Sequence, residues 1–152
     1  MPLMVRRACL EEAEQVADVF LHARATMTYL PRLHTEAETR AWMAGHVLIN
    51  DEVWVAEGEG EIVGFLALHG DWVDHLYILP EYQRQGIGRL LITKAKERLP
   101  QGMQLWAFQK NTQARRFYEA QGFVLSKLTD GADNEEREPD ALYVWKPFAS
   151  EA

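Results

Sequence analysis

Two glycines, Gly86 and Gly88, lie between Arg84 and Arg89, immediately before a run of residues with helical spacing. The first amides of a helix have no partner within the helix, and the helix dipole adds partial positive charge beside them. Glycine lets an anionic group approach the backbone closely, and the two arginines add full positive charges. The pattern therefore predicts a phosphate-binding cradle at the helix start, with a purely structural turn as the alternative.

Two familiar phosphate-binding motifs do not fit this stretch. A dinucleotide-binding fold places G-x-G-x-x-G near the first strand, whereas this chain has Leu91 at the third glycine position and carries the stretch past its middle. A P-loop requires a Gly-Lys-Ser/Thr sequence, which does not follow here. The anion therefore belongs to another class of ligand.

The elements around this stretch can be predicted from hydrophobic periodicity and turn residues. The pattern predicts an α/β (α+β) fold with the order βααβββαβαββ and a mixed sheet that carries helices on both faces. Thr35 is the expected N-cap of the second helix, and Gly58 and Gly60 are expected to turn a hairpin. The expected strands are 3–7, the two runs flanking the hairpin glycines, 71–79, 103–108, 123–128 and 141–145, and the expected helices are 13–30, one after Thr35, 87–99 and 112–121.

Length and composition limit the function classes. The 152 residues suggest one domain, and 47% hydrophobic residues suffice for a core. A net charge of -7 makes general nucleic-acid binding unexpected, because phosphate contacts need clustered Lys and Arg. No apolar run approaches a membrane span, no signal peptide is expected, and the single Cys9 fits the reducing cytoplasm. The five histidines lack metal-site spacing, so no metal is expected.

Three segments together resemble one protein family. Gln83–Gly88 resembles the Q/R-x-x-G-x-G/A signature of the GNAT superfamily of N-acetyltransferases, and Asn111–Phe123 resembles the family's N-x-x-A-x-x-F-Y-x-x-x-G-F motif. Leu76–Tyr82 resembles the strand before the signature, which in the family is splayed from its neighbour by a bulge. The resemblance implies a GNAT-like, mostly antiparallel sheet, a single acetyltransferase domain over 1–152, and acetyl-CoA as acetyl donor.

The resemblance also implies a role for individual residues. Main-chain groups of Leu76, Tyr77 and Ile78 are expected to pair with the pantetheine arm or to polarise the thioester carbonyl. Asn111 is expected to hydrogen-bond the same arm. Tyr118 is expected to face the thioester sulfur. The amides that would hold the pyrophosphate are those of Arg84, Gln85, Gly86, Ile87, Gly88 and Arg89.

Acetyl transfer to an amine poses two proton problems. A free alkylamine has a pKa of about 10.4, so removing its proton at pH 7 costs roughly 4–5 kcal/mol unless the site supplies a base. The leaving thiolate also needs a proton, which Tyr118 is expected to donate, although core packing would explain this residue as well. Asp74 is the expected base, because it lies two residues before Leu76 on the same strand. Glu57 and a water chain are alternatives.

The acceptor is expected to be a primary amine of a small or cationic molecule. The acidic segment 130–140 reads as a solvated loop, but it could instead attract such a cation. Tyr29, His34 and Trp42 are expected to pack within helices rather than to touch substrate. Alternatives to this activity are a non-catalytic acyl-CoA-binding or sensing module and a protein N-terminal or lysine acetyltransferase. Relatives that acetylate protein N-termini use a glutamate on the strand before the second motif, and 105–111 carries no acid. A homodimer through sheet edges is a further expectation.

Overall fold

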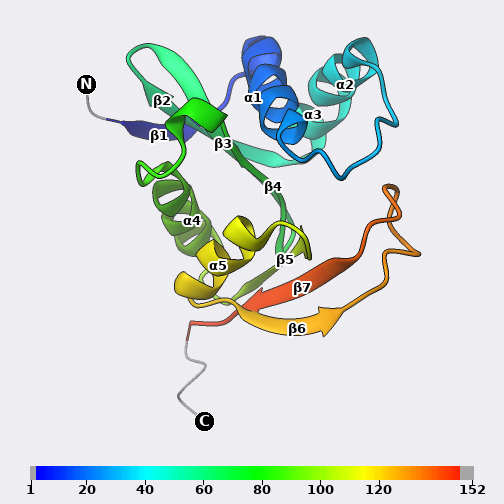
Figure 1. Ribbon diagram of the computed structural model, residues 1–152. Coiled ribbons are helices and arrows are strands. Elements are labelled where there is room, and N and C mark those ends of the chain that lie inside the picture. The colour runs from blue at the N-terminus through cyan, green and yellow to red at the C-terminus, as the bar shows by residue number, and fades with distance from the viewer. Residues whose placement is uncertain (1–2, 148–152) are drawn as a thin grey trace.

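The computed structural model of the protein describes residues 3–147, which form one seven-stranded sheet of order β1-β2-β3-β4-β5-β7-β6 (Figure 1). β4 and β5 are parallel, and the other neighbouring strands are antiparallel. The mixed, mostly antiparallel sheet predicted from the sequence is thereby confirmed. The strands are β1 (Met4–Arg7), β2 (Glu52–Gly58), β3 (Glu61–His69), β4 (Trp72–Ile78), β5 (Met103–Phe108), β6 (Val124–Leu128) and β7 (Asp140–Trp145).

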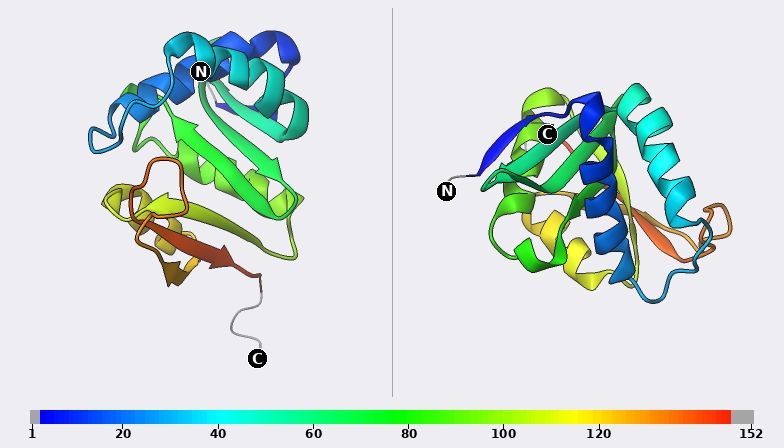
Figure 2. Two further views of the ribbon diagram at one scale, coloured as in Figure 1. Left: turned by 90° about the vertical axis from the view of Figure 1, so that its right-hand side faces the viewer. Right: turned by 90° about the horizontal axis from the view of Figure 1, so that it is seen from above.

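Helices cover both faces of the sheet, as Figures 1 and 2 show. One face carries α1 (Ala13–Ala25), α2 (Glu36–Trp42), a π-helical turn (Met43–Val47) and α3 (Leu48–Asn50), and the other carries α4 (Ile87–Arg98) and α5 (Thr112–Ala120). The expected element order holds when α2 to α3 is counted as one bent helical segment. α1 ends earlier than expected, because the Thr26 hydroxyl donates to the Ala23 carbonyl at 2.7 Å and terminates the helix locally.

Two local predictions are confirmed by their hydrogen bonds and dihedral angles. The Thr35 hydroxyl accepts from the Glu38 amide at 3.0 Å, and the Glu38 carboxylate accepts from the Thr35 amide at 2.8 Å, which is a capping box. The turn between β2 and β3 has positive φ at both central residues, 54° at Glu59 and 78° at Gly60. This geometry matches the twist of the flanking strands.

β3 is the central strand of the core, as its apolar sequence predicts. Every residue from Ile62 to Leu68 is buried, with α1 against one face and α4 against the other. Phe65 and Leu66, on opposite faces, are fully buried. α4 is anchored to this core by an apolar stripe that includes Leu91 and Ile92, so its N-terminal end is held in place beside β4.

β4 carries a bulge and then separates from β5. Ala67 pairs with His75 and Leu68 pairs with Val73, so Asp74 is an extra residue in the ladder. β4 and β5 share a single paired position, Trp72 with Gln104. Beyond this pair the two strands diverge, and part of the β4 backbone faces a gap instead of a neighbouring strand. The splayed strand expected from the family resemblance is therefore present.

No helix within residues 3–147 combines the length and the apolar character that crossing a membrane requires.

The anchoring of α4 can be tested with two leucines of the same helix. Leu91 is fully buried, whereas Leu90 is 41% exposed. We expect Leu91→Ala to lower the free energy of unfolding by about 2–5 kcal/mol, because it leaves a cavity in the core. Leu90→Ala, the matched control, should cost less than about 1 kcal/mol. Urea denaturation measures both, and equal losses would contradict the described packing.

Candidate active site

The start of α4 has the geometry of an anion-binding cradle. Gly86 precedes the helix with φ 83°, a left-handed conformation, and a Cβ added there would meet no atom within 4 Å. The first helical hydrogen bond runs from the Leu90 amide to the Gly86 carbonyl at 3.1 Å, so the amides before Leu90 have no partner within the helix. Arg84 also has a positive φ, 65°, which turns the chain into this position.

Gly88 is required for close packing rather than for its dihedral angle. A Cβ at this residue would lie 3.2 Å from Ile78 Cδ1 and 3.2 Å from Phe117 Cζ. The missing side chain therefore lets the first turn of α4 approach β4 and α5 closely. The two glycines of the motif thus have different functions: Gly86 leaves space beside the amides, and Gly88 brings them close to the strand.

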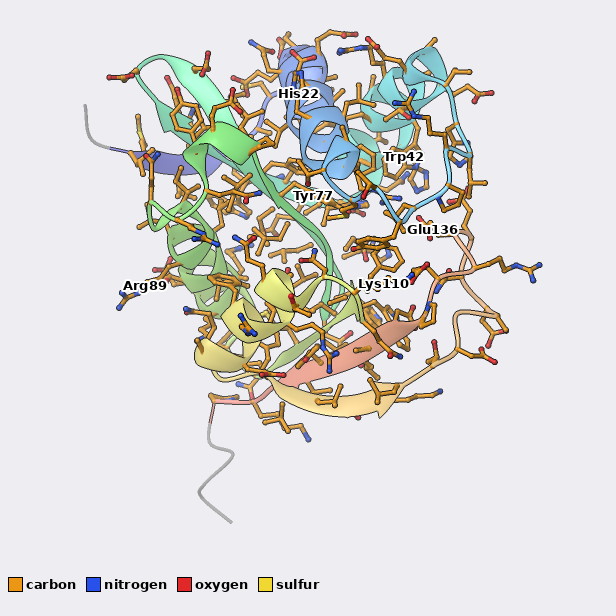
Figure 3. The ribbon with its side chains drawn as sticks, viewed as in Figure 1. His22, Trp42, Tyr77, Arg89, Lys110 and Glu136 are labelled. Carbon is orange, nitrogen blue, oxygen red and sulfur yellow. The ribbon has the colours of Figure 1, made fainter. Side chains whose placement is uncertain are left out.

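A cavity of about 720 Å³ begins at this cradle and extends between β4, α5 and the end of α1. Figure 3 shows Arg89 and Lys110 on opposite sides of this region, with Tyr77 between them and α1. The lining combines backbone groups, cationic side chains and aromatic rings. It comprises Ala23, Thr26, Met27, Tyr29, Leu76, Tyr77, Ile78, Gln83, Arg84, Gly86, Gly88, Arg89, Lys110, Asn111, Thr112, Gln113, Ala114, Phe117 and Tyr118.

Most of the predicted binding residues meet at this cavity. Leu76, Tyr77, Ile78, Arg84, Gly86, Gly88, Arg89, Asn111 and Tyr118 all belong to its lining. Two predicted residues have other contacts. The Gln85 side chain donates to the Glu81 carbonyl at 3.4 Å, and the Ile87 side chain is buried in the core. Both residues were expected to bind the pyrophosphate through their main-chain amides. Contacts of their side chains do not test that prediction.

Asn111 and Tyr118 are both placed by α5. The Asn111 side-chain oxygen accepts from the Ala114 amide at 3.1 Å and caps the helix, so its NH₂ group is the part that can donate to a ligand. Tyr118 is buried and packs against Phe123 and Tyr143, with ring centroids 5.6 and 6.3 Å away. Burial, and to a lesser extent the neighbouring Tyr77, raises the pKa of Tyr118 above its ordinary value. Its phenol is therefore protonated and able to donate at neutral pH.

Asp74, the expected base, does not belong to the cavity lining formed by the described residues. Asp74 is exposed beside Asp51 and His69, and the ligating atoms of these three side chains lie within 4.8 Å of one another. Its expected position depended on strict alternation along the strand, which the bulge at this residue interrupts. The catalytic role of Asp74 stays a prediction that no contact with the cavity supports. The alternative candidate, Glu57, pairs with Arg6 at 2.8 Å on β1.

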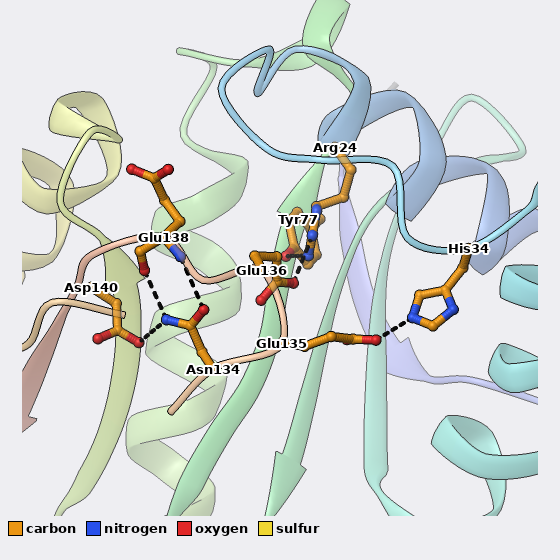
Figure 4. A network of polar contacts seen from close by, with 8 residues as sticks. All are labelled: Arg24, His34, Tyr77, Asn134, Glu135, Glu136, Glu138 and Asp140. Atoms are coloured by element: carbon orange, nitrogen blue, oxygen red, sulfur yellow. Dashed lines mark hydrogen bonds and ion pairs between the residues drawn. The ribbon is translucent and has the colours of Figure 1, made fainter. Parts of the chain in front are cut away.

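The loop between β6 and β7 lies beside the cavity, where Glu138 is 3.5 Å from the lining residue Lys110. Arg24, from the last turn of α1, donates to Glu136 of this loop at 2.9 Å and to the Tyr77 hydroxyl at 3.4 Å (Figure 4). Burial lowers the pKa of Arg24, but Tyr77 and Glu136 more than offset this effect, so the pKa lies above its ordinary value. His34 contacts Glu135 of the same loop. The loop is therefore attached to the segment that follows α1.

The segment 130–140 is partly buried beside the cavity, and only part of it is the solvated loop that its composition favours. Glu138 and Asp140 are each only 8% exposed. Asn134 is the reason, because its side chain donates to the Glu138 carbonyl at 2.7 Å and to the Asp140 carboxylate at 3.1 Å. A single amide side chain thereby ties the loop to the first residue of β7.

Of the three aromatic or histidine residues expected to pack within helices, Trp42 does so, whereas Tyr29 and His34 lie in the segment between α1 and α2. Trp42 packs on Phe20 and His75, with ring centroids 5.3 Å from each. Burial lowers the pKa of His75 to about 4, so the ring is neutral within this aromatic cluster. Tyr29, in contrast, lines the cavity and packs against Phe108. The predicted helix over 13–30 placed Tyr29 within a helix, and the earlier end of α1 at Ala25 is what brings it to the cavity.

Sequence reasoning missed several charged residues of the site. Arg24 and Lys110 approach the cavity from α1 and from the turn after β5, and Glu138 lies behind Lys110 at 3.5 Å from its ammonium group. Lys110 directly precedes the motif residue Asn111, which was the one available hint. Arg24 and Glu138 have no motif, because their proximity depends on how the β6–β7 loop folds.

Comparisons with known proteins agree with this geometry. The family model "Acetyltransferase (GNAT) domain" matches residues 50–125. The peptidyl-lysine N-acetyltransferase YjaB of Salmonella typhimurium is 33% identical over 135 residues, which cover 88% of this chain and 91% of the relative. The peptidyl-lysine N-acetyltransferase YiaC of Escherichia coli is 38% identical over 77 residues, which cover 50% of this chain but only 52% of the relative.

The fold comparison points to the same class of protein. The solution structure of apo-form YjaB from Escherichia coli has a TM-score of 0.77 with 26% sequence identity, and the match covers 95% of this chain and 98% of that chain. The chain therefore belongs to the GNAT family of acetyltransferases. It is an acetyl-CoA-dependent N-acetyltransferase that acts on amine acceptors, as the cradle, the splayed strand and the second motif predicted.

The cradle can be tested by filling the space beside Gly86. We expect Gly86→Glu to weaken acetyl-CoA binding by about 100-fold or more, because the side chain brings bulk and negative charge to the free amides. Gly60→Glu is the matched control: Gly60 also has a positive φ and open space around it, but it lies in the β2–β3 turn. Isothermal calorimetry measures both affinities. Similar affinity in the two variants would contradict the phosphate cradle.

The environment of Asp74 can be tested through the pH dependence of stability. Although the Asp74 residue is largely exposed, partial desolvation of its carboxyl group, followed by repulsion from Asp51, raises its pKa to about 6. An acid with a raised native pKa binds its proton more tightly in the folded state, so the wild type loses stability as the pH rises from about 4 to 6. Asp74→Asn does not titrate, and its advantage over the wild type should grow across this window by about 1 kcal/mol, after allowance for solvent screening.

Urea denaturation at several pH values measures this advantage, and a constant difference from pH 4 to pH 7 would contradict the described contact with Asp51. The same variant decides the catalytic role predicted for Asp74. Because the carboxyl group lies outside the cavity, we expect kcat to stay within about twofold, whereas loss of a general base typically costs about 100-fold or more.

Proposed function

We propose that the protein acetylates the side-chain amine of lysine in proteins or peptides, with acetyl-CoA as donor. One observation carries the proposal: a single cavity joins the free amides at the start of α4 to the buried phenol of Tyr118 and to Lys110, which the acidic β6–β7 loop contacts through Glu138. The phosphate end suits the donor, and the acidic end suits a cationic acceptor. The relatives named peptidyl-lysine N-acetyltransferases support the choice of lysine over other amines.

The residues present fit acetyl-CoA as a donor substrate. The open space at Gly86 leaves room for a phosphate group beside the amides, and Arg84 and Arg89 add positive charge. The backbone of 76–78, freed by the divergence of β4 and β5, can pair with the amides of the pantetheine arm. The Asn111 NH₂ group can donate to the same arm. The donor supplies an acetyl group already activated as a thioester.

The chain's own residues must then manage the protons of the transfer. The acceptor ammonium first loses one proton to water, and its neutral nitrogen then bonds to the acetyl carbon. The carbon–sulfur bond breaks, and the departing sulfur takes a proton. We assign that proton to the Tyr118 hydroxyl, whose raised pKa keeps it protonated until the sulfur develops negative charge. A proton released from the acceptor nitrogen restores the phenol, so the enzyme ends the cycle as it began.

We also propose that residues 1–152 act as a single acetyltransferase domain, as a homodimer in the cytoplasm. One sheet includes every described strand. The edge strand β6 exposes Val124, Leu125 and Leu128, which are 62%, 39% and 54% exposed, and this apolar edge supports association through the sheet. Light scattering measures the mass in solution, and a monomer at high concentration would contradict the dimer.

The proton donor can be tested by removing one oxygen atom. We expect Tyr118→Phe to lower kcat by about 100-fold or more with little change in acetyl-CoA affinity, because the ring still fills its site. Tyr82→Phe is the matched control, since Tyr82 carries an exposed phenol outside the cavity that donates to Glu61. The assay follows release of the coenzyme A thiol with a lysine-containing peptide. A near-normal rate for Tyr118→Phe would show that the thiolate leaves without this acid.

The same assay tests the acceptor class. Wild-type protein should release thiol with lysine peptides and do so far more slowly with peptides whose lysines are replaced by norleucine. Binding of acetyl-CoA without turnover on any amine would contradict the enzyme and favour a sensing module of the same fold.

A further inference from the structure

Two buried polar atoms near Lys110, a residue of the cavity lining, have no hydrogen-bond partner. They are the Tyr29 hydroxyl oxygen and Glu138 Oε2, the two such side-chain atoms found within residues 3–147. Burying a carboxylate oxygen without a hydrogen bond is costly, so such atoms are rare unless a ligand satisfies them. The two residues are also close enough that Glu138 contributes to raising the pKa of Tyr29, after the larger effect of burial.

The nearest cation to these atoms is a lysine of the chain itself. Lys110 Nζ lies 3.5 Å from Glu138 Oε2, within ion-pair range but long for a hydrogen bond, and 5.8 Å from the centre of the Tyr29 ring. The Lys110 side chain is 62% exposed, whereas that of Glu138 is 11% exposed. A lysine ammonium group therefore rests loosely between a fixed carboxylate and an aromatic ring, and it can move into water at little cost.

The position of Glu138 is fixed by the loop and not by its own carboxylate. Its amide donates to the Asn134 side chain at 3.2 Å, and its carbonyl accepts from the same side chain at 2.7 Å (Figure 4). Gly131, with φ 83°, packs so tightly on this backbone that a Cβ would lie 2.4 Å from the Glu138 carbonyl carbon. The backbone of Glu138 is thus held in place by contacts that do not use its carboxylate, whose nearby cation is Lys110.

The neighbouring carboxylates already have strong partners. Glu136 pairs with Arg24 at 2.9 Å, and Asp140 accepts from Thr129 and Asn134. Glu135 is exposed and contacts His34. Of the acidic residues in the loop, Glu138 therefore combines deep burial with a single weak, exchangeable cation, which makes it the carboxylate best placed to receive an amine from the cavity.

We propose that Glu138 and Tyr29 form the subsite that binds the ammonium group of an incoming lysine, and that Lys110 occupies this subsite until the substrate displaces it. The inference rests on the proposed function and names the residues that recognise its acceptor. The carboxylate supplies the charge, and the aromatic ring supplies a cation–π contact and an apolar surface for the lysine methylenes. Lys110 keeps the buried carboxylate paired in the free enzyme, and the acceptor must compete with it.

The test measures binding of Nα-acetyl-lysine methylamide by NMR titration, with the uncharged Nα-acetyl-norleucine methylamide as matched probe. Lys110→Met removes the competitor, so we expect it to bind the lysine probe about threefold or more tightly than wild type. Adding Glu138→Gln to Lys110→Met should weaken that binding by about tenfold, because the charge-assisted contact is lost. The norleucine probe should respond to neither change. Glu135→Gln, on the same loop, is the control.

Two results would overturn the subsite. One is lysine-probe affinity that is no higher in Lys110→Met than in wild type. The other is that adding Glu138→Gln to Lys110→Met lowers the affinity for both probes equally, or for neither. Failure of the lysine probe to bind any variant counts as this second result. Near-ultraviolet circular dichroism of each variant confirms that the fold is retained.

The subsite and the proposed function can fail separately. If the lysine probe binds in a Glu138-dependent way but no thiol is released from acetyl-CoA, the subsite is supported and the lysine acetyltransferase activity is contradicted. If lysine peptides are acetylated and Glu138→Gln does not change their KM, the activity is supported and the subsite is contradicted.

Discussion

The active site depends on one departure from regular pairing in the sheet. β4 and β5 run side by side but are paired at only one position, Trp72 with Gln104, so the later part of β4 has backbone groups without a neighbouring strand on that side. Buried backbone groups require partners, and in this protein the cavity beside the later part of β4 gives a ligand the opportunity to supply them. A linear pantetheine arm with amides along its length is well suited to such an edge, in the manner of an added strand.

The other half of the site depends on where α4 begins. The helix is fixed by its buried stripe against β3, and its first turn is brought close to β4 by the absence of a side chain at Gly88. The free amides of that turn then lie at one end of the cavity, and Tyr118 of α5 lies along it. Donor binding and proton donation therefore use neighbouring elements on the same face of the sheet. On the other face, α1 and the β6–β7 loop meet through Arg24 and Glu136, and we propose that the acceptor enters there.

The parts of this account that could be predicted from sequence are those whose residues are close together in the chain. The cradle at Gly86 and Gly88 and the helix that carries Asn111 and Tyr118 are local patterns, and the structure brings both to one cavity. The order of helices and strands along the chain followed from hydrophobic periodicity for the same reason. The prediction that Asp74 lies on the same face of β4 as Leu76 was also based on neighbouring residues. It assumed an uninterrupted strand, and the bulge at Asp74 breaks the regular alternation.

The acceptor end could not be predicted in this way. Arg24, Tyr29, Lys110 and Glu138 come from four separate segments and meet only because the β6–β7 loop folds over the end of α1. Composition suggested a solvated acidic loop, since a run of carboxylates usually remains in water. The structure instead buries Glu138 and Asp140 through the hydrogen bonds of Asn134, a pairing that has no sequence periodicity.

The central claim is that the cofactor arm binds in the gap between β4 and β5, with its phosphates at the start of α4. Backbone amide NMR during a titration with coenzyme A tests it most directly. The account predicts the largest shifts at the amides of 76–78 and 86–89, with the β2–β3 turn at Glu59 and Gly60 unaffected. Shifts confined to other parts of the chain, or none at millimolar coenzyme A, would contradict it.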